Sequence, residues 1–197
     1  MTLAEMRTMV RRNLMDEDSA NYSFTDDELD RHILHAVKDF SEEMPRQQKA
    51  ETATTEGSRE VDISTLTDRV MVEGVEYPLG QYPAQFRQFT IWGDIITIHD
   101  GQVPDGTDCA IYYGELHTLN DETSTIPAQY EELTAEGAAG YAAMAWAVYG
   151  INRVNVGGEG VNNDWEGLGK MKLEYFRGEL RRLSRKNRVR IRRMYLG

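Results

Sequence analysis

Cysteine is almost absent from this sequence, which has only Cys109 among its 197 residues. One cysteine excludes an internal disulfide and any zinc site made of several thiolates. We therefore expect Cys109 to be a small apolar side chain of the core. Histidine is also scarce, and only His32 and His35 have the spacing of two metal ligands on one helix face. Since no third ligand follows from the spacing, we predict neither a metal nor any other cofactor.

Motifs for nucleophilic catalysis and phosphate binding are missing as well. The sequence has no Gly-x-Ser-x-Gly elbow, and its one thiol falls in an alternating, strand-like pattern. The glycines of residues 156–160 do not follow a strand, and Gly167–Lys170 is followed by Met171 where a phosphate loop needs a hydroxyl. We therefore predict that these glycines are hinges and that the protein is not an enzyme.

Long apolar runs are missing too. The most apolar stretch has no charge over residues 137–152, whereas a membrane-spanning helix needs about 20 apolar residues. The N-terminal residues MTLAEMRTMVRR have the pattern of an amphipathic helix and lack the basic-then-apolar order of a signal peptide. We expect a protein that is made in the cytoplasm and binds no membrane.

A long central helix is predicted over residues 126–150. Pro127 suits a first helical turn, and Glu131 and Glu132 favour the positive end of the helix dipole. Apolar residues cover both faces, which is typical of a helix buried on every side. Its small residues allow another backbone to approach, either from the same chain or from another subunit. The residues predicted to pack between subunits are Gly137, Gly140, Tyr141, Met144 and Trp146.

Helices are also predicted before and after this central one. Thr2 with Glu5 and Thr25 with Glu28 have the spacing of capping boxes, and the second of these helices should run from about Asp26 to Glu43. A last helix should begin at Asp164 and pack back on the central helix. Its apolar positions are Leu168, Met171, Tyr175, Leu180 and Leu183.

Between these helical parts the apolar period changes from helical to alternating. Val61 with Ile63 and Val75 with Tyr77 have the period of half-buried strands, and Gly93-Asp94 is a favoured hairpin turn. The predicted fold class is therefore α+β: a bundle of about four helices with an inserted small antiparallel sheet and an extended basic C-terminal arm. The predicted parts are N-terminal helices in 1–50, a β lobe in 51–122, the central and last helices in 123–187, and the arm in 188–197.

Charge is distributed unevenly along the chain. Residues 177–197 carry nine Arg and Lys against one Glu, a charge of +8, so residues 1–176 carry −19 of the total of −11. From Arg188 on, basic and apolar residues alternate, which favours an extended arm that docks on a protein surface. The alternatives are nucleic-acid binding through the arginines and a solvated tail. The arm consists of Arg188, Val189, Arg190, Ile191, Arg192, Arg193, Met194, Tyr195 and Leu196.

Two stretches resemble the head-tail connector, or adaptor, proteins of tailed bacteriophages. They are YSFTDDELDRHILHAVKDFSEEMP, after a short N-terminal helix, and STIPAQYEELTAEGAAGYAAMAWAVYG, which leads to the Arg-rich end. The resemblance runs through both helical parts and the sheet between them and so covers most of the chain. The β lobe is larger than in the most compact members of that family, which leaves open the neighbours it would touch.

The resemblance implies a structural protein of the virion neck. Such proteins form a closed ring of about twelve copies below the portal. The ring joins the DNA-filled head to the tail and lines part of the channel through which DNA leaves. The implied partners are other copies of the chain, the portal protein, a downstream tail or neck protein, and DNA that passes without sequence-specific binding. The arm from Arg188 to Leu196 would reach the portal.

Overall fold

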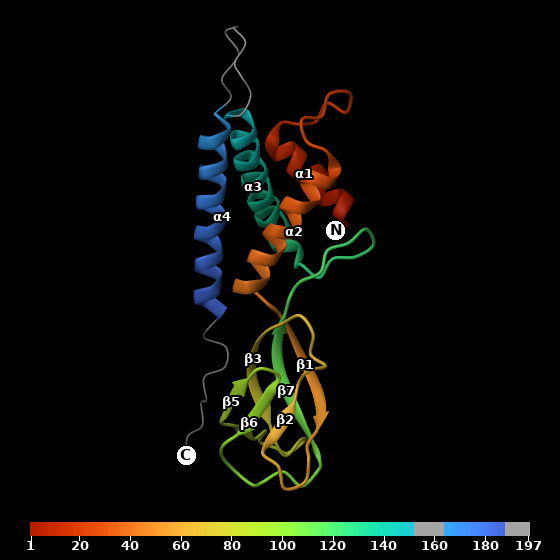
Figure 1. Ribbon diagram of the computed structural model, residues 1–197, viewed down its shortest axis with the longest axis vertical. Helices are drawn as coiled ribbons and strands as arrows, with labels where there is room; N and C mark the ends of the chain where they lie inside the picture. Colours follow the sequence, from red (N-terminus) through yellow and green to blue (C-terminus); the bar gives the residue numbers. More distant parts are fainter. Residues whose placement is uncertain (152–163, 188–197) are drawn as a thin grey trace. The chain divides into compact units, whose positions relative to one another are not determined.

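The computed structural model describes residues 1–151 and 164–187 and divides into two units (Figure 1). The helical unit comprises residues 1–44 and 117–187, and the β unit comprises residues 45–116. This arrangement confirms the predicted α+β class. The helical unit contains α1 (Leu3–Leu14), α2 (Asp26–Glu43), the short 3₁₀ helix η1 (Ala128–Tyr130), α3 (Glu131–Ile151) and α4 (Trp165–Asn187).

The predicted helix starts are confirmed by their capping bonds. Thr2 and Thr25 each accept a bond from the backbone N–H of the glutamate three residues on, and that glutamate accepts a bond from the N–H of the threonine. At α4, Asp164 Oδ1 accepts a bond from Gly167 N at 2.7 Å. These bonds satisfy backbone donors that a helix leaves unpaired in its first turn. Helix α2 ends before Pro45, as predicted.

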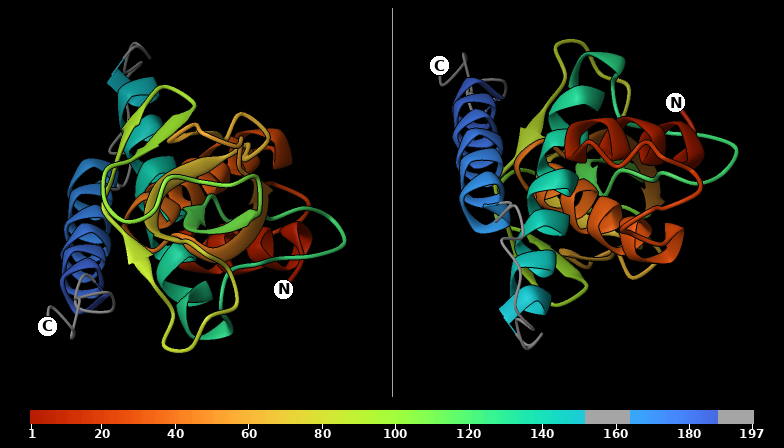
Figure 2. Two further views of the ribbon diagram at one scale, coloured as in Figure 1. Left: turned by 90° about the horizontal axis from the view of Figure 1, so that it is seen from below. Right: turned by 90° about the horizontal axis from the view of Figure 1, so that it is seen from above.

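Helix α3 is the centre of the helical unit. It lies between α4 on one side and α1 and α2 on the other (Figures 1 and 2). The alanines that face these neighbours are fully buried, namely Ala135, Ala138, Ala139, Ala142 and Ala143. Burial does not extend along the whole helix, because Val148 and Tyr149 near its C-terminal end are exposed. The prediction that α3 is buried on every side is therefore wrong for its last turns.

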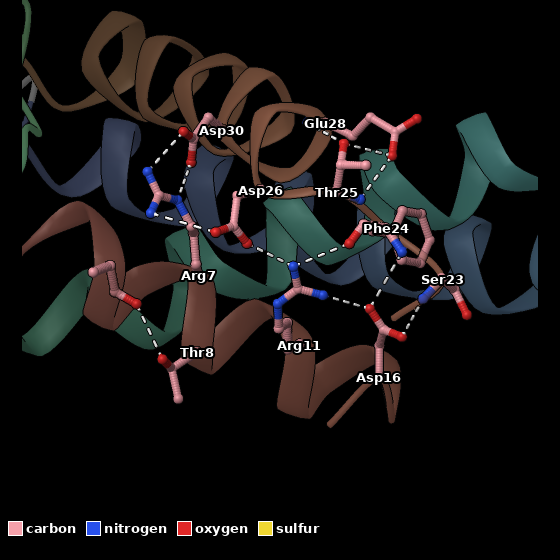
Figure 3. A network of polar contacts seen from close by, with 11 residues as sticks. Arg7, Thr8, Arg11, Asp16, Ser23, Phe24, Thr25, Asp26, Glu28 and Asp30 are labelled. Atoms are coloured by element: carbon pink, nitrogen blue, oxygen red, sulfur yellow. Dashed lines mark hydrogen bonds and ion pairs between the residues drawn. The ribbon is translucent and has the colours of Figure 1, made fainter. Parts of the chain in front are cut away.

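A buried arginine fixes the loop between α1 and α2 (Figure 3). Arg11 donates to Asp16 Oδ2 at 2.7 Å, to the Phe24 carbonyl at 3.0 Å and to Asp26 Oδ1 at 2.7 Å. Asp16 in turn accepts a bond from the backbone N–H of Ser23 at 2.7 Å. Because Arg11 and Asp16 are both buried, each needs the other to compensate for its lost hydration. The network holds the loop closed and sets the start of α2.

The β unit contains two antiparallel sheets, where one was predicted. The four-stranded sheet has the order β1-β7-β3-β4 and the three-stranded sheet the order β2-β6-β5. Buried side chains alternate with more exposed ones along β2 and β6, whereas three consecutive residues near the start of β7 are buried. The strands are β1 (Arg46–Ala53), β2 (Glu60–Asp62), β3 (Arg69–Glu76), β4 (Phe86–Arg87), β5 (Phe89–Trp92), β6 (Ile95–Ile98) and β7 (Asp108–Glu115).

The boundaries of the β unit differ from the predicted 51–122. Strand β1 begins at Arg46, inside the stretch assigned to the N-terminal helices, and pairs with β7 from Arg46↔Glu115 to Ala53↔Asp108. The chain rejoins the helical unit at His117, and Leu119 is buried in the helical core. Strand β1 lies at the edge of its sheet and carries no large apolar side chain. It therefore lacks the alternating hydrophobic signal by which strands are recognised.

The predicted hairpin at Gly93-Asp94 and the predicted role of Cys109 are both confirmed. Strands β5 and β6 pair from Phe89↔Ile98 to Trp92↔Ile95, and Gly93 has φ +60°, which glycine adopts easily. Cys109 is fully buried in the core between the strands. Burial raises the pKa of its thiol to about 11, so the side chain is neutral packing material and not a nucleophile.

Candidate interaction surfaces of the helical unit

The small residues of α3 serve a close contact with α4. A Cβ atom on Gly137 would lie 2.7 Å from the Phe176 ring, and one on Gly140 would lie 2.8 Å from Leu173 Cγ. The relation is mutual, because a Cβ on Gly169 of α4 would lie 2.8 Å from Met144 Cγ. The two helices thus approach each other at glycines on both sides. This confirms that α4 packs back on α3.

Three of the residues predicted to pack between subunits therefore have their contact inside the chain. Gly137 and Gly140 are covered by α4, and Met144 fills the space above Gly169. The small size of Gly137 and Gly140 is explained by α4 of the same chain, which already occupies the space beside them. A contact of Gly137 or Gly140 with another subunit stays a prediction.

Tyr141 joins three helices through its hydroxyl and its ring. Its hydroxyl donates to Asp39 Oδ2 on α2 and accepts from Arg177 Nη2 on α4 at 3.4 Å. The His35 ring stacks on the Tyr141 ring with centroids 4.0 Å apart. Burial, and then the bond to Asp39, raise the pKa of Tyr141, so the phenol stays neutral at physiological pH. Tyr141 thus acts as a bridge within the helical unit.

Trp146 belongs to an aromatic cluster near the C-terminal end of α3. Its ring centroid lies 5.0 Å from that of Phe24 and 6.3 Å from that of Trp165. The cluster joins the loop before α2 to the first turn of α4. A contact of Tyr141, Met144 or Trp146 with another subunit stays a prediction, since these three side chains are only partly buried.

Helix α4 has two apolar stripes, and only one of them packs on α3. The buried stripe is Leu173, Phe176, Leu180 and Leu183. Met171 and Tyr175, which were predicted to pack, are 60% and 59% exposed. Steps of three and four residues fit both stripes, so the pattern alone does not distinguish them. The prediction that Met171 and Tyr175 belong to the packed face of this helix is therefore wrong.

The exposed stripe of α4 forms one wall of an open groove. The groove has a volume of about 660 Å³, with walls from α1 and α4 and a floor from α3, and we call it the α1–α4 groove. Three of its four charged residues form ion pairs: Lys172 with Glu136 at 2.7 Å, and Arg12 with Glu17 at 3.6 Å. The lining residues are Met9, Arg12, Asn13, Glu132, Leu133, Glu136, Met171, Lys172 and Tyr175.

Glu132 is the lining charge that has no ion-pair partner among residues 1–151 and 164–187. It is exposed at the start of α3, next to the partly buried Leu133. The groove therefore offers apolar side chains together with one carboxylate that is not neutralised. Such a surface fits a partner with an apolar side chain and a nearby cation.

Helix α2 exposes one apolar side chain together with two cations. Leu34 is 51% exposed, and Arg31 and Lys38, three residues before and four after it, are exposed on the same face. Neither cation forms an ion pair within the described ranges. We call Arg31, Leu34 and Lys38 the α2 ridge.

A smaller depression of about 260 Å³ lies between α2 and α4. Its lining combines acidic residues of α2 with basic residues of α4, namely Asp39, Glu42, Glu43, Arg177, Leu180 and Arg181. On the β unit, Tyr82 and Trp92 are almost fully exposed, and Trp92 lies at the end of the β5–β6 hairpin. Exposed large aromatics are common in protein contacts.

Metal-binding side chains do not cluster in the described part of the chain. No three His, Cys, Asp or Glu side chains there gather closely enough to hold a metal ion. The pKa of His32 is lowered, first by burial and then by the positive charges of Arg31 and His35. Both effects disfavour the protonated form of its ring. None of the helices described here is long and apolar enough to cross a membrane. The predicted arm from Arg188 to Leu196 lies outside the described residues.

Comparison with known proteins adds no family assignment. No protein-family model matches the chain, and no curated protein matches its sequence.

Proposed function

We propose that this protein is a structural component of the neck of a tailed bacteriophage. It forms a ring below the portal, joins the DNA-filled head to the tail and lines part of the DNA exit channel. It acts by binding other protein chains, and the Arg-rich arm from Arg188 to Leu196 binds the portal. The proposal begins from the resemblance of residues 22–45 and 124–150 to connector proteins.

The observation that carries the proposal is the pair of unfilled surfaces on the helical unit. Met171 and Tyr175 expose most of their surface on one side of α4, although a well-formed core of buried residues lies beneath that helix. Leu34 does the same on α2. Large apolar side chains gathered at a groove mark contact sites on soluble proteins. A subunit that meets a neighbour on each side needs two such surfaces.

The distribution of charge supports a passage for DNA. Residues 1–176 carry a net charge of −19. Proteins bind DNA phosphates through Lys and Arg side chains, which release the counterions condensed on the DNA. An acidic wall does not bind the genome and lets it slip past. We expect the channel surface of the ring to be predominantly acidic, and a structure of the ring with a basic lumen would contradict this.

A nucleic-acid-binding protein is the alternative, and one observation favours it. The last turns of α4 expose Arg181, Arg182, Arg185 and Lys186, which continue into the basic residues of the arm. Arg182 is bound to Glu179 at 2.7 Å, so the described part of this surface is partly neutralised. Repulsion of DNA by the acidic remainder of the chain argues against this alternative.

Deleting residues 188–197 tests the two functions. We expect the shortened protein to keep its circular-dichroism spectrum and thermal unfolding, because the two cores described above are built from residues outside the deleted segment. Binding to purified portal rings should be lost. DNA retardation by the full chain that weakens steeply with salt, and disappears on deletion, would favour the nucleic-acid alternative.

Two matched variants separate charge from docking. In one, Val189 and Ile191 become serine, and in the other, Arg188, Arg190 and Arg192 become glutamine. Portal binding should weaken in both, because docking uses the apolar residues as well as the charges. If only the glutamine variant loses binding, and it loses DNA binding equally, the docking role of the arm is wrong.

A further inference from the structure

We propose that the α2 ridge of one copy binds in the α1–α4 groove of the next copy. The inference rests on the proposed function, because it names the surfaces by which the subunits of the ring meet. The occupant of the groove is thus a second copy of this chain. Leu34 is the side chain that enters, and Arg31 and Lys38 lie on either side of it.

The apolar parts of the two surfaces match. Leu34 presents a branched aliphatic side chain that is half exposed, and the groove presents Met9, Leu133, Met171 and Tyr175. Methionine side chains are unbranched and polarizable, so they adapt their shape to an entering leucine. Each of these side chains is at least partly open to water in the single chain, and burying them together is favourable.

The charges of the two surfaces match as well. The two cations of the ridge have no ion-pair partner in the described ranges. Glu132 of the groove likewise has no ion-pair partner there. The basic residues of the groove do not oppose the contact, because Lys172 and Arg12 already face Glu136 and Glu17. Opposite charges at the rim set the register of such a contact.

The position of the two surfaces fits a ring. The groove is lined by residues of α1, α3 and α4 and contains none from α2. The α2 ridge is therefore a different surface, and one subunit can use both at once. A contact between two different surfaces is heterologous, and repeating it generates a closed ring or an open filament. A contact of like surfaces would stop at a dimer.

Engineered disulfides test this pairing. The full chain carrying both Leu34→Cys and Tyr175→Cys is concentrated, oxidised and separated on a non-reducing gel. We expect a ladder of disulfide-linked multimers, because each copy would be joined to two neighbours. Cys109 is fully buried and does not interfere. The matched control joins Leu34→Cys to Arg185→Cys, an exposed position of α4 outside the groove, and should give no ladder.

Each other outcome overturns the pairing. Dimers from Leu34→Cys alone indicate contact between two α2 ridges, dimers from Tyr175→Cys alone indicate contact between two grooves, and no cross-linking excludes the contact. A charge exchange gives a second readout. Lys38→Glu and Glu132→Lys should each lower the yield of the ladder about tenfold, and the double variant should restore it. A double variant as poor as the single variants contradicts the proposed register.

The disulfide experiment uses purified protein and does not depend on the virion. A ladder from a protein that fails to bind portal rings would support the pairing and reject the neck function. Portal binding without a ladder would keep the function and reject the pairing.

Discussion

Replacing Arg11 by alanine is expected to lower the free energy of unfolding of the helical unit by about 3 to 5 kcal/mol, the usual cost of breaking a buried ion pair. Arg11 and Asp16 are both less than a tenth exposed. Without the guanidinium, Asp16 stays buried with a charge, and the Phe24 carbonyl loses a bond of 3.0 Å. Asp26 also loses a partner at 2.7 Å. The loss is measured by urea denaturation followed by circular dichroism.

Arg12→Ala is the matched control for this variant. Arg12 is the next residue of the same helix, its side chain is 69% exposed, and its distance to Glu17 is 3.6 Å. Exposed pairs of this kind contribute about 0 to 1 kcal/mol. The two substitutions remove the same atoms, so the difference isolates burial. Equal losses for the two variants would mean that the Arg11 network does not hold the α1–α2 loop.

Replacing Gly137 by alanine is expected to destabilise the helical unit by about 2 kcal/mol, within the usual range for overpacking a core. The new Cβ would lie 2.7 Å from Phe176, whose ring is fully buried. Because the ring is packed within the core, the ring or α4 must shift to accept the new atom. An overpacking cost of about 3 kcal/mol, less the gain of about 1 kcal/mol that alanine gives over glycine in a helix, leaves this net loss of about 2 kcal/mol. Urea denaturation measures the net change.

Gly178→Ala should have the opposite sign. Gly178 is on the exposed side of α4, and nothing lies within 4 Å of a Cβ built there. Only the helix propensity then changes, so the unit should become about 0.5 to 1 kcal/mol more stable. If both substitutions stabilise the protein, the close approach of α3 and α4 at Gly137 is wrong.

The parts of the fold that the sequence predicts well are those with local causes. Thr25 with Glu28 sets the start of α2, Pro45 sets its end, and Asp164 sets the start of α4. The Gly93 turn likewise depends on the conformational freedom of one residue. Such signals need only a few neighbouring residues, so they can be read without knowing the rest of the structure.

The parts that the sequence predicts poorly depend on distant partners. Strand β1 is polar and exists because β7 pairs with it along its whole length. Helix α4 has two apolar stripes, and the choice between them is made by the glycines of α3, which accept Phe176 and Leu173. Neither fact appears in the period of the side chains. Tertiary contacts decide which of two possible patterns is used.

The candidate site illustrates the same limit. Small residues of α3 correctly predicted a close neighbour, but Gly137 and Gly140 meet α4 of the same chain. The α1–α4 groove brings together Met9, Leu133 and Tyr175 from three helices that are far apart in the sequence. Only the folded helical unit reveals that these side chains share one surface and that Glu132 beside them has no ion-pair partner within residues 1–151 and 164–187.

The central claim is that this chain joins head to tail by binding other protein chains. Electron microscopy of particles assembled without the protein tests that claim most directly. The account predicts DNA-filled heads without attached tails. Particles that form normal tails in its absence would contradict it.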